Sequence, residues 1–295
     1  MIKSFTKGIS IGLKQSKIAL TIYLLQLLLA LPLALQVFRV LNASIGDSLE
    51  VEKLIYDYDN TIFRDFLNAH GDAITPLIGQ TRWIVIVYFI FWIFLKGGVF
   101  YCIKEQTSRW ETFWTGGARH FFRFLKVSVF FLVLHLVWAG LVMFIMSAIL
   151  GDAINDMPTE REIVLAIAAG VIVWLVGLFF LIVANLLTKI KIVSEYRQKV
   201  WTSIVDGLKW TSANLFKGVG LYILFFLLQI TFFGIYFGVD MASGMVSETL
   251  ILVFFFLQQL LVFSRILIRI MAAGAFWDLH ERSRPEPELI AHTTD

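Results

Sequence analysis

Apolar side chains dominate six long stretches of this sequence, and polar side chains gather in the segments between them. Each stretch is at least about 20 residues long and carries few charges, which suits an α-helix crossing the roughly 30 Å hydrocarbon core of a bilayer. The pattern predicts an all-α integral membrane protein with six transmembrane helices. The predicted spans are 18–41, 77–103, 127–150, 163–188, 218–239 and 250–276.

A basic stretch with a glycine comes before the first, third and fifth of these spans. The three stretches contain Gly8, Gly117 and Gly207 and end at Lys17, Lys126 and Lys217. In the second stretch, apolar residues from Trp110 to Leu125 recur at i, i+3, i+4 and i+7, with Arg119, Arg123 and Lys126 on the opposite side. This spacing is typical of an amphipathic helix that lies at the membrane interface.

The order of basic stretch, span and returning span occurs three times in the chain. We therefore predict one membrane domain of three hairpin repeats, covering residues 1–103, 104–188 and 189–276, with a cytoplasmic tail at 277–295. Each repeat starts with a basic amphipathic helix, here called an elbow.

The segment 42–75 between the first two spans is predicted to form an extracytoplasmic helix. Val51, Leu54, Tyr58 and Phe66 fall on one helical stripe. The acidic side chains opposite, with His70, can be read as metal ligands, but their spacing matches no defined cation loop. A solvated acidic face is the favoured interpretation, and no metal or cofactor is expected. The acidic residues concerned are Asp57, Asp59 and Asp65.

The composition agrees with a membrane protein. Of 295 residues, 58% are hydrophobic and 16% are charged, whereas soluble domains average about 45–50% apolar and about 25% charged residues. Cys102 is the single cysteine, which excludes a disulfide within the chain.

The basic residues divide unevenly between the two sides of the membrane. On the predicted topology, 20 of the 25 lysines and arginines lie on the side of the elbows and both termini. Because Lys and Arg resist translocation, that side is predicted to be cytoplasmic. The expected location is a bacterial inner membrane, with both termini inside. This basic face suits anionic phospholipid rather than nucleic acid.

Amide and imidazole groups inside the predicted spans are the natural candidates for an intramembrane site. Gln26 and His135 each lie nine residues after the closing lysine of their elbow. Gln229 lies twelve residues after Lys217, about one turn deeper, and Gln258 stands at a similar depth on the last span. These four residues can form a polar cluster that serves transport. The favoured alternative is that they hold helices together, because no carboxylate lies deep in any span.

Cations near the cytoplasmic ends of the returning spans form a second candidate site. Arg265 and Arg269 are one turn apart on the last span, and Lys96 occupies the end of the second. These side chains either reach outward to the membrane surface or form an inward pocket for a phosphate or an anionic lipid headgroup. With Arg119 and Arg123 of the second elbow, they are the candidate lipid-binding or phosphate-binding residues.

Signatures of catalysis are missing from the sequence. It contains no GxSxG, HExxH or GxxxxGK[ST] motif and no paired Cys or His at metal-binding spacing. We therefore identify no catalytic residue and expect the protein not to be an enzyme.

The order of elements and the stretch 201–217, which includes Trp210, Ala213 and Asn214, suggest a family. With Gly117 and Arg269, they resemble a broad set of bacterial six-helix inner-membrane proteins that includes the YciC-like proteins. That set is similar to the membrane domain of some glycerophosphodiester phosphodiesterases. The resemblance covers nearly the whole chain and implies an inner-membrane helper in lipid or envelope metabolism. The catalytic barrel of those phosphodiesterases has no counterpart here.

Two functions remain open on these grounds. The first is a non-enzymatic membrane scaffold or accessory subunit whose basic face engages anionic lipid, a partner protein or a second copy of the chain. The alternative is a transporter or lipid-moving protein with a polar site between its helices.

Overall fold

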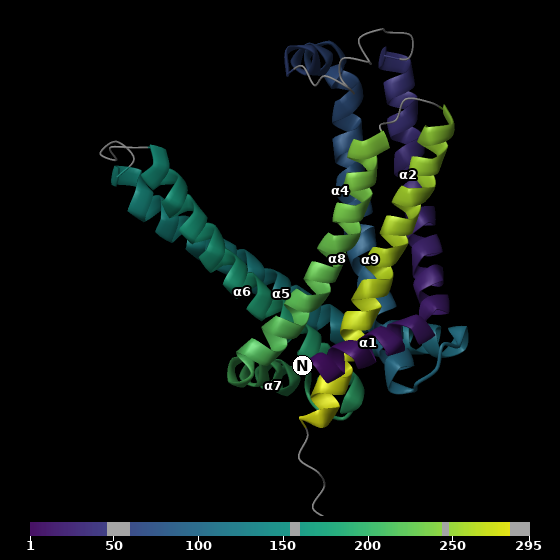
Figure 1. Cartoon of the computed structure of the whole chain (residues 1–295), viewed down its shortest axis with the longest axis vertical. Helices are drawn as coiled ribbons and strands as arrows, with labels where there is room; N and C mark the ends of the chain where they lie inside the picture. The colour runs from purple at the N-terminus through teal and green to yellow at the C-terminus, as the bar shows by residue number, and fades with distance from the viewer. Residues whose placement is uncertain (46–59, 154–159, 244–247, 284–295) are drawn as a thin grey trace, which may run out of the picture. The chain divides into compact units, whose positions relative to one another are not determined.

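The computed structural model describes residues 1–45, 60–153, 160–243 and 248–283 (Figure 1). The described residues are helical apart from short connections, and they contain no strand. The helices are α1 (Ile2–Lys14), α2 (Ser16–Ile45), α4 (Asn60–Lys104), α5 (Trp110–Ala153), α6 (Glu160–Ser194), α7 (Val200–Ala213), α8 (Leu215–Ser243) and α9 (Glu248–Arg282).

Six helices are long and apolar enough to cross a membrane, as the sequence predicts. Their apolar stretches cover Ser16–Val40, Thr81–Lys104, Trp110–Ile149, Ile163–Ser194, Leu215–Ser243 and Thr249–Arg282. Large apolar side chains are exposed along these helices, which fits a surface that meets lipid chains rather than water. The chain is therefore an integral membrane protein.

The chain divides into two compact units, Thr21–Trp92 and the remainder of the chain. In the first unit, α2 and the beginning of α4 are joined by a hydrogen bond of 3.2 Å from Gln26 Nε2 to the Tyr88 hydroxyl. Tyr88 also stacks on Trp92, with 6.3 Å between the ring centroids.

The second unit is built around the C-terminal part of α9. Residues 270–280 of this helix are all buried, and α1 lies across them (Figure 1). Gly8 and Gly12 of α1 face α9, where a Cβ on Gly8 would lie only 2.6 Å from the Met271 carbonyl oxygen. The two backbones can approach this closely because Gly8 has no side chain.

The recurring glycine of each elbow makes a close contact with a returning span. Gly8 packs on α9, Gly117 packs on Phe94 of α4, and Gly207 packs on Thr188 of α6. A Cβ on Gly117 would lie 2.8 Å from the Phe94 ring, and one on Gly207 would lie 3.1 Å from the Ala184 carbonyl oxygen. Each elbow thus contacts the last span of another predicted repeat, and the first elbow contacts the last span of the chain.

Three boundaries differ from the predicted ones. The second elbow is not a separate helix, because residues 110–126 run directly into the third span as α5. Residues 60–75 of the predicted external helix belong to α4, whereas residues 46–59, including Asp57 and Asp59, lie outside the described residues. Residues 277–282, expected in a tail, continue α9.

Candidate functional site

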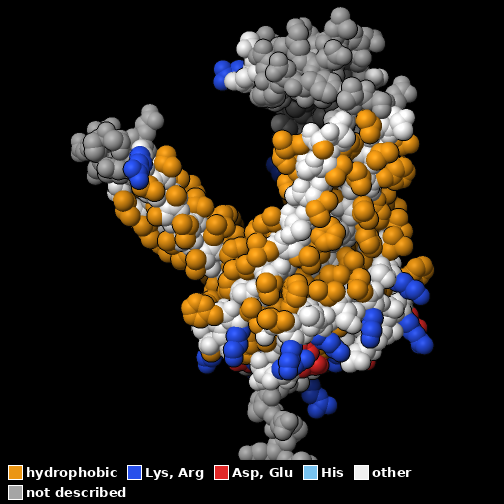
Figure 2. All heavy atoms as spheres, in the orientation of Figure 1, with side chains coloured by type: hydrophobic (Ala, Val, Ile, Leu, Met, Phe, Trp, Pro, Cys, Tyr) orange, Lys and Arg blue, Asp and Glu red, His pale blue; other side chains and the backbone are white. Residues whose placement is uncertain are grey.

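Lys and Arg side chains gather along the edge of the second unit where α1, α7 and the end of α9 lie (Figure 2). We call this region the basic edge and define it by its exposed cations. Apolar surface borders it in the same view. The exposed cations are Lys3, Lys7, Lys14, Lys17, Lys104, Arg109, Arg119, Lys126, Arg197, Lys199, Lys209, Lys217 and Arg282.

Exposed aromatic side chains accompany these cations. Trp110 and Phe122 of α5 and Trp201 of α7 are largely uncovered by protein, and Trp201 is 66% exposed. Tryptophan beside lysine and arginine is typical of a surface at the depth of lipid headgroups.

Two of the predicted lipid-binding residues make contacts with protein groups. The Arg119 guanidinium lies 4.3 Å from the ring centroid of Tyr196 and 6.0 Å from that of Tyr101. Arg123 Nη1 donates a hydrogen bond of 2.7 Å to the Tyr196 carbonyl, and its Nη2 donates to the Gln198 carbonyl. Both arginines therefore help to fix the connection between α6 and α7.

The carboxyl end of α6 attracts a further cation. Lys104 Nζ donates a hydrogen bond of 3.1 Å to the Val193 carbonyl. The last carbonyls of a helix have no partner within the helix and carry partial negative charge, so Lys and Arg stabilise them. His120 is buried at the same place, with its ring centroid 5.8 Å from that of Tyr196.

Asp206 of α7 neutralises part of the basic edge. Its Oδ2 lies 3.2 Å from Lys191 Nζ and accepts a hydrogen bond of 2.8 Å from Gln198 Nε2. Partial burial raises the pKa of this carboxyl, but the contacts with Gln198 and Lys191 and the charge of Lys209 lower it, and the net pKa is below its ordinary value. The contact joins α6 to α7.

Three further cations of the second unit act on one another and differ in burial: Lys189 is buried, Lys96 is half-buried and Arg269 is exposed. Lys189 of α6 is 3% exposed, and its Nζ lies 5.8 Å from the ring centroid of Phe124 on α5. The charge of Lys96 acts on Lys189, and the charge of Arg269 acts on Lys96. Lys96 and Arg269 were predicted as site residues. The burial of Lys189 was not predicted, because its sequence position also suits a side chain that reaches outward.

Arg265 has no described interaction with these three cations. Like Arg269 it is exposed, whereas its neighbours Ser264 and Ile266 are buried. The contacts described for the chain include none for the Arg265 guanidinium. Of the two arginines predicted to accompany Lys96, Arg269 acts on it electrostatically, and the pocket formed by all three stays a prediction.

The predicted polar cluster consists of residues with separate, local contacts. Gln26 bonds to Tyr88 as described above, and Gln258 Nε2 donates a hydrogen bond of 2.9 Å to the Tyr236 hydroxyl. His135 Nδ1 lies 2.5 Å from the carbonyl oxygen of Phe131 on its own helix. Among the described side chains, no contact joins His135, Gln229 and Gln258.

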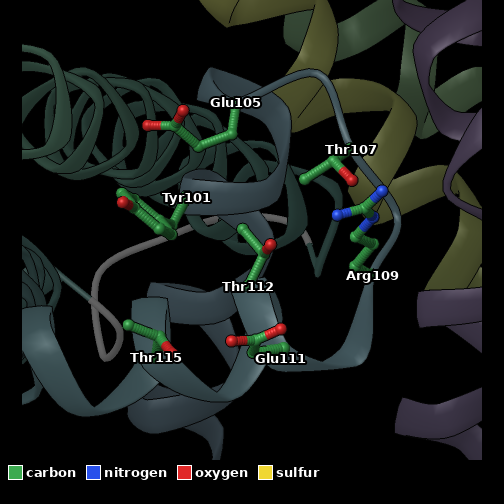
Figure 3. Close-up of a pocket in the computed structure, with 7 residues that line it drawn as sticks. All are labelled: Tyr101, Glu105, Thr107, Arg109, Glu111, Thr112 and Thr115. Atoms are coloured by element: carbon green, nitrogen blue, oxygen red, sulfur yellow. The ribbon is translucent and has the colours of Figure 1, made fainter.

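A polar pocket of about 540 Å³ lies where α4 turns into α5 (Figure 3). In this view Tyr101 and Glu105 lie on one side of the hollow, and Thr107 and Arg109 lie across from them. The pocket contains both signs of charge and suits a polar group without specifying its class. Its lining residues are Tyr101, Glu105, Thr107, Arg109, Glu111, Thr112 and Thr115.

A second cavity, of about 580 Å³, is lined by apolar residues of α5 and α6, together with Leu208 of α7 and Leu215 of α8. Trp138 Nε1 donates a hydrogen bond of 3.1 Å to the Trp174 carbonyl across this hairpin. Because the groove lies on transmembrane helices, its apolar lining fits lipid chains in general.

No metal site is found in the part of the chain that the structure describes, where no group of three or more His, Cys, Asp or Glu side chains is suitably placed. Comparisons with models of known protein families, with curated proteins and with solved structures found no match to this chain. The resemblance to YciC-like proteins therefore remains an expectation from the sequence.

Proposed function

We propose that this chain is a non-enzymatic scaffold or accessory subunit of a bacterial inner membrane, with both termini in the cytoplasm. In this proposal its basic edge engages the headgroups of anionic phospholipids and holds the protein, with any partner, at a defined depth. The protein is built from three hairpin repeats that each begin with an elbow.

The observation that carries the proposal is the set of exposed cations on the three elbows, together with an exposed tryptophan on the second elbow and another on the third. Lys7 and Lys14 lie on α1, Trp110 begins α5, and Lys209 and Trp201 both lie on α7. Each basic residue near an anionic membrane surface contributes about 1 kcal/mol of attraction. A face with several such residues would enrich anionic lipid around the protein.

The test is a comparison of lipid retention. The whole chain would be reconstituted in nanodiscs of phosphatidylcholine with about 20% phosphatidylglycerol, a fraction chosen to give a clear negative surface potential. Native mass spectrometry then counts the anionic lipids that remain bound. Replacing Lys7, Lys14, Lys209 and Lys217 by Gln should lower that number, and added salt should lower it for the unaltered protein.

A matched control replaces Arg82 and Arg161, which are exposed and assigned to the opposite side, by Gln. Their replacement should leave lipid retention unchanged. Equal retention of phosphatidylcholine and phosphatidylglycerol by the unaltered protein would contradict the proposal. Mass spectrometry of the gently purified protein would also identify any protein partner.

A lipid-moving activity is the second candidate, and the inner position of Lys189 is what favours it. A buried cation between spans can draw a phosphate away from the membrane surface, whereas an exposed cation only attracts it. Faster transfer of fluorescent phosphatidylglycerol between the leaflets of proteoliposomes would favour this candidate. Transfer at the rate of empty liposomes would exclude it.

A further inference from the structure

Ser128 of α5 is the buried polar group whose neighbours point to a ligand. This side chain is 8% exposed, and its Oγ has no hydrogen-bond partner among the described residues. The buried Oδ1 of Asn185 on α6 also lacks a partner. A buried polar atom that is not hydrogen-bonded costs about 1–3 kcal/mol, and such atoms are rare unless they serve a purpose.

The register of the α5–α6 hairpin brings these two groups to one level. Lys189 lies against Phe124, and α5 and α6 run in opposite directions, as the contacts of Trp138 with Trp174 and of Arg123 with Ile192 show. Ser128 lies one turn after Phe124, and Asn185 lies one turn before Lys189. Both therefore lie about 6 Å deeper in the membrane than the Lys189 level.

Lys189 supplies positive charge beside these two groups. It shares one helical face with Asn185, because the two residues are four apart on α6. Its side chain is almost fully buried, and its Nζ faces the Phe124 ring. Lysine is rarely buried so completely unless an anion or several polar groups accompany it.

Two more cations approach the same place from other helices. Lys96 of α4 lies close enough to Lys189 for their charges to repel, and Arg269 of α9 acts on Lys96 in the same way. Gly97 and Gly98 follow Lys96 and allow α4 to approach α5 closely, since a Cβ on Gly98 would lie 2.5 Å from the Phe113 carbonyl oxygen. Like charges held together in a poorly polarisable interior favour a bound anion.

We propose that Lys189, Lys96 and Ser128 form a phosphate-binding site among α4, α5 and α6, which accepts the phosphate of an anionic lipid headgroup. Lys189 and Lys96 supply charge-assisted hydrogen bonds to the phosphate oxygens, and the Ser128 hydroxyl donates a third. Rotation of the Asn185 amide about its terminal bond presents the Nδ2 donors to the same oxygens. Arg269 adds positive charge from α9.

This inference rests on the proposed function, since it names an inner site for the lipids that the basic edge is proposed to attract. The two differ in the residues that they require. The basic edge depends on exposed lysines such as Lys209, whereas the inner site depends on Lys189 and Ser128.

The test uses the whole chain in nanodiscs of phosphatidylcholine with or without phosphatidic acid, and the variants Lys189→Met, Lys189→Arg, Ser128→Ala and Arg161→Met. Lys189→Met should reduce tightly retained phosphatidic acid about tenfold, as expected for loss of a hydrogen bond to a charged group. Ser128→Ala should reduce it about threefold. Lys189→Arg should largely preserve retention, and Arg161→Met, at an exposed position outside the basic edge, should leave the tightly retained lipid unchanged.

A stability measurement separates a ligand site from a merely structural lysine. Without anionic lipid, Lys189→Met should unfold at the same temperature as the unaltered protein or at a higher one, because replacing a buried charge by an apolar side chain is often stabilising. Phosphatidic acid should raise the midpoint of the unaltered protein and not that of Lys189→Met. A Lys189→Met variant that is less stable in both membranes would overturn the proposal.

A comparison of inorganic phosphate with phosphatidic acid shows whether the ligand is the free ion or a lipid headgroup. If inorganic phosphate at millimolar concentration gives the Lys189-dependent stabilisation and phosphatidic acid gives none, the ligand of the site is the free ion and the lipid assignment is wrong. If inorganic phosphate has no effect while phosphatidic acid acts, the ligand is a lipid headgroup. Loss of retention in the basic-edge variants with normal retention in Lys189→Met overturns the inner site alone. No retention by the unaltered protein overturns both proposals.

Discussion

Arg123 Nη1 on α5 donates a hydrogen bond of 2.7 Å to the backbone carbonyl of Tyr196, just beyond the end of α6. A second nitrogen of the same guanidinium bonds to the Gln198 carbonyl. One side chain of the second predicted repeat thus fixes the connection that leads into the third. The planar fork of arginine suits two carbonyl acceptors, which a lysine ammonium cannot bridge in the same way.

Replacing Arg123 should loosen this connection. We expect Arg123→Met to lower the free energy of unfolding by about 2 kcal/mol, because hydrogen bonds from a charged donor are lost, and Arg123→Lys to restore part of that loss. The thermal midpoint in detergent and the rate of trypsin cleavage after Arg197 measure the effect. Lys126→Met, at an exposed position, is the control and should change neither. Slow cleavage in Arg123→Met would show that other contacts hold the connection.

The contact between α1 and α9 should be sensitive to the size of one residue. Gly8→Ala places a methyl group 2.6 Å from the Met271 carbonyl oxygen, and such overpacking typically costs about 1–3 kcal/mol. We expect a lower thermal midpoint and faster trypsin cleavage after Lys7 and Lys14. Gly140→Ala is the matched control, because a Cβ there meets nothing within 4 Å; it should be neutral or slightly stabilising. Equal behaviour of the two variants would argue against close packing at Gly8.

The contacts of Asp206 should make the stability of the folded protein depend slightly on pH. Its pKa in the folded protein is below the ordinary value, so its stabilising contribution is complete above the pKa of the unfolded chain, about 3.9. The contribution is lost as the pH falls through the folded pKa. The effect should stay below about 1 kcal/mol, since the pair is partly solvated. Thermal midpoints between about pH 5 and pH 3 should fall less steeply for Asp206→Asn. Parallel curves for both proteins would contradict this assignment.

The amides of the spans should behave as links between helices. Gln258→Leu removes the hydrogen bond to Tyr236, and hydrogen bonds within membranes contribute about 0.6–2 kcal/mol each. We expect a loss of that size without any change in retained anionic lipid. Gln229→Leu, which removes no described hydrogen bond, serves as the control for the added leucine. A large fall in lipid retention in Gln258→Leu would restore the polar-site interpretation.

The predicted orientation can be tested by labelling. In a Cys102→Ser background, Lys3→Cys should react with a membrane-impermeant maleimide only when the cytoplasmic face is accessible. Arg161→Cys should react from the opposite side, because the uneven distribution of Lys and Arg predicts it to be outside. Both positions are exposed, so lack of reaction from either side would not follow from burial. Reversed labelling would invert the proposed topology.

The spans were predictable because bilayer thickness and backbone hydrogen bonding leave few alternatives to a long apolar helix. The second elbow was harder to delimit. Residues 110–126 and the following span are both helical, and no proline or cap between them marks whether the helix ends, so sequence did not show that α5 continues through them. The first elbow, in contrast, is a separate helix, because α1 ends at Lys14 and Gln15 is its C-cap.

The inner site was only partly predictable. Lys96 and Arg269 stand out because cations in apolar stretches are rare, whereas Lys189 looked like a residue that reaches outward at a helix end. Its burial depends on how α5 and α6 are aligned against each other, which a single sequence does not specify. Ser128 carried no signal at all, since serine is common in transmembrane helices and usually bonds to its own backbone.

The contact of α1 with α9 has a consequence for how the protein is made. The ribosome delivers α1 long before residues 270–280, so Gly8 and Gly12 have no docking surface until those residues of α9 have been made. Contacts between residues so distant in sequence form late. A chain cut short before α9 would leave its first helix undocked, and this exposed helix would distinguish incomplete proteins from finished ones.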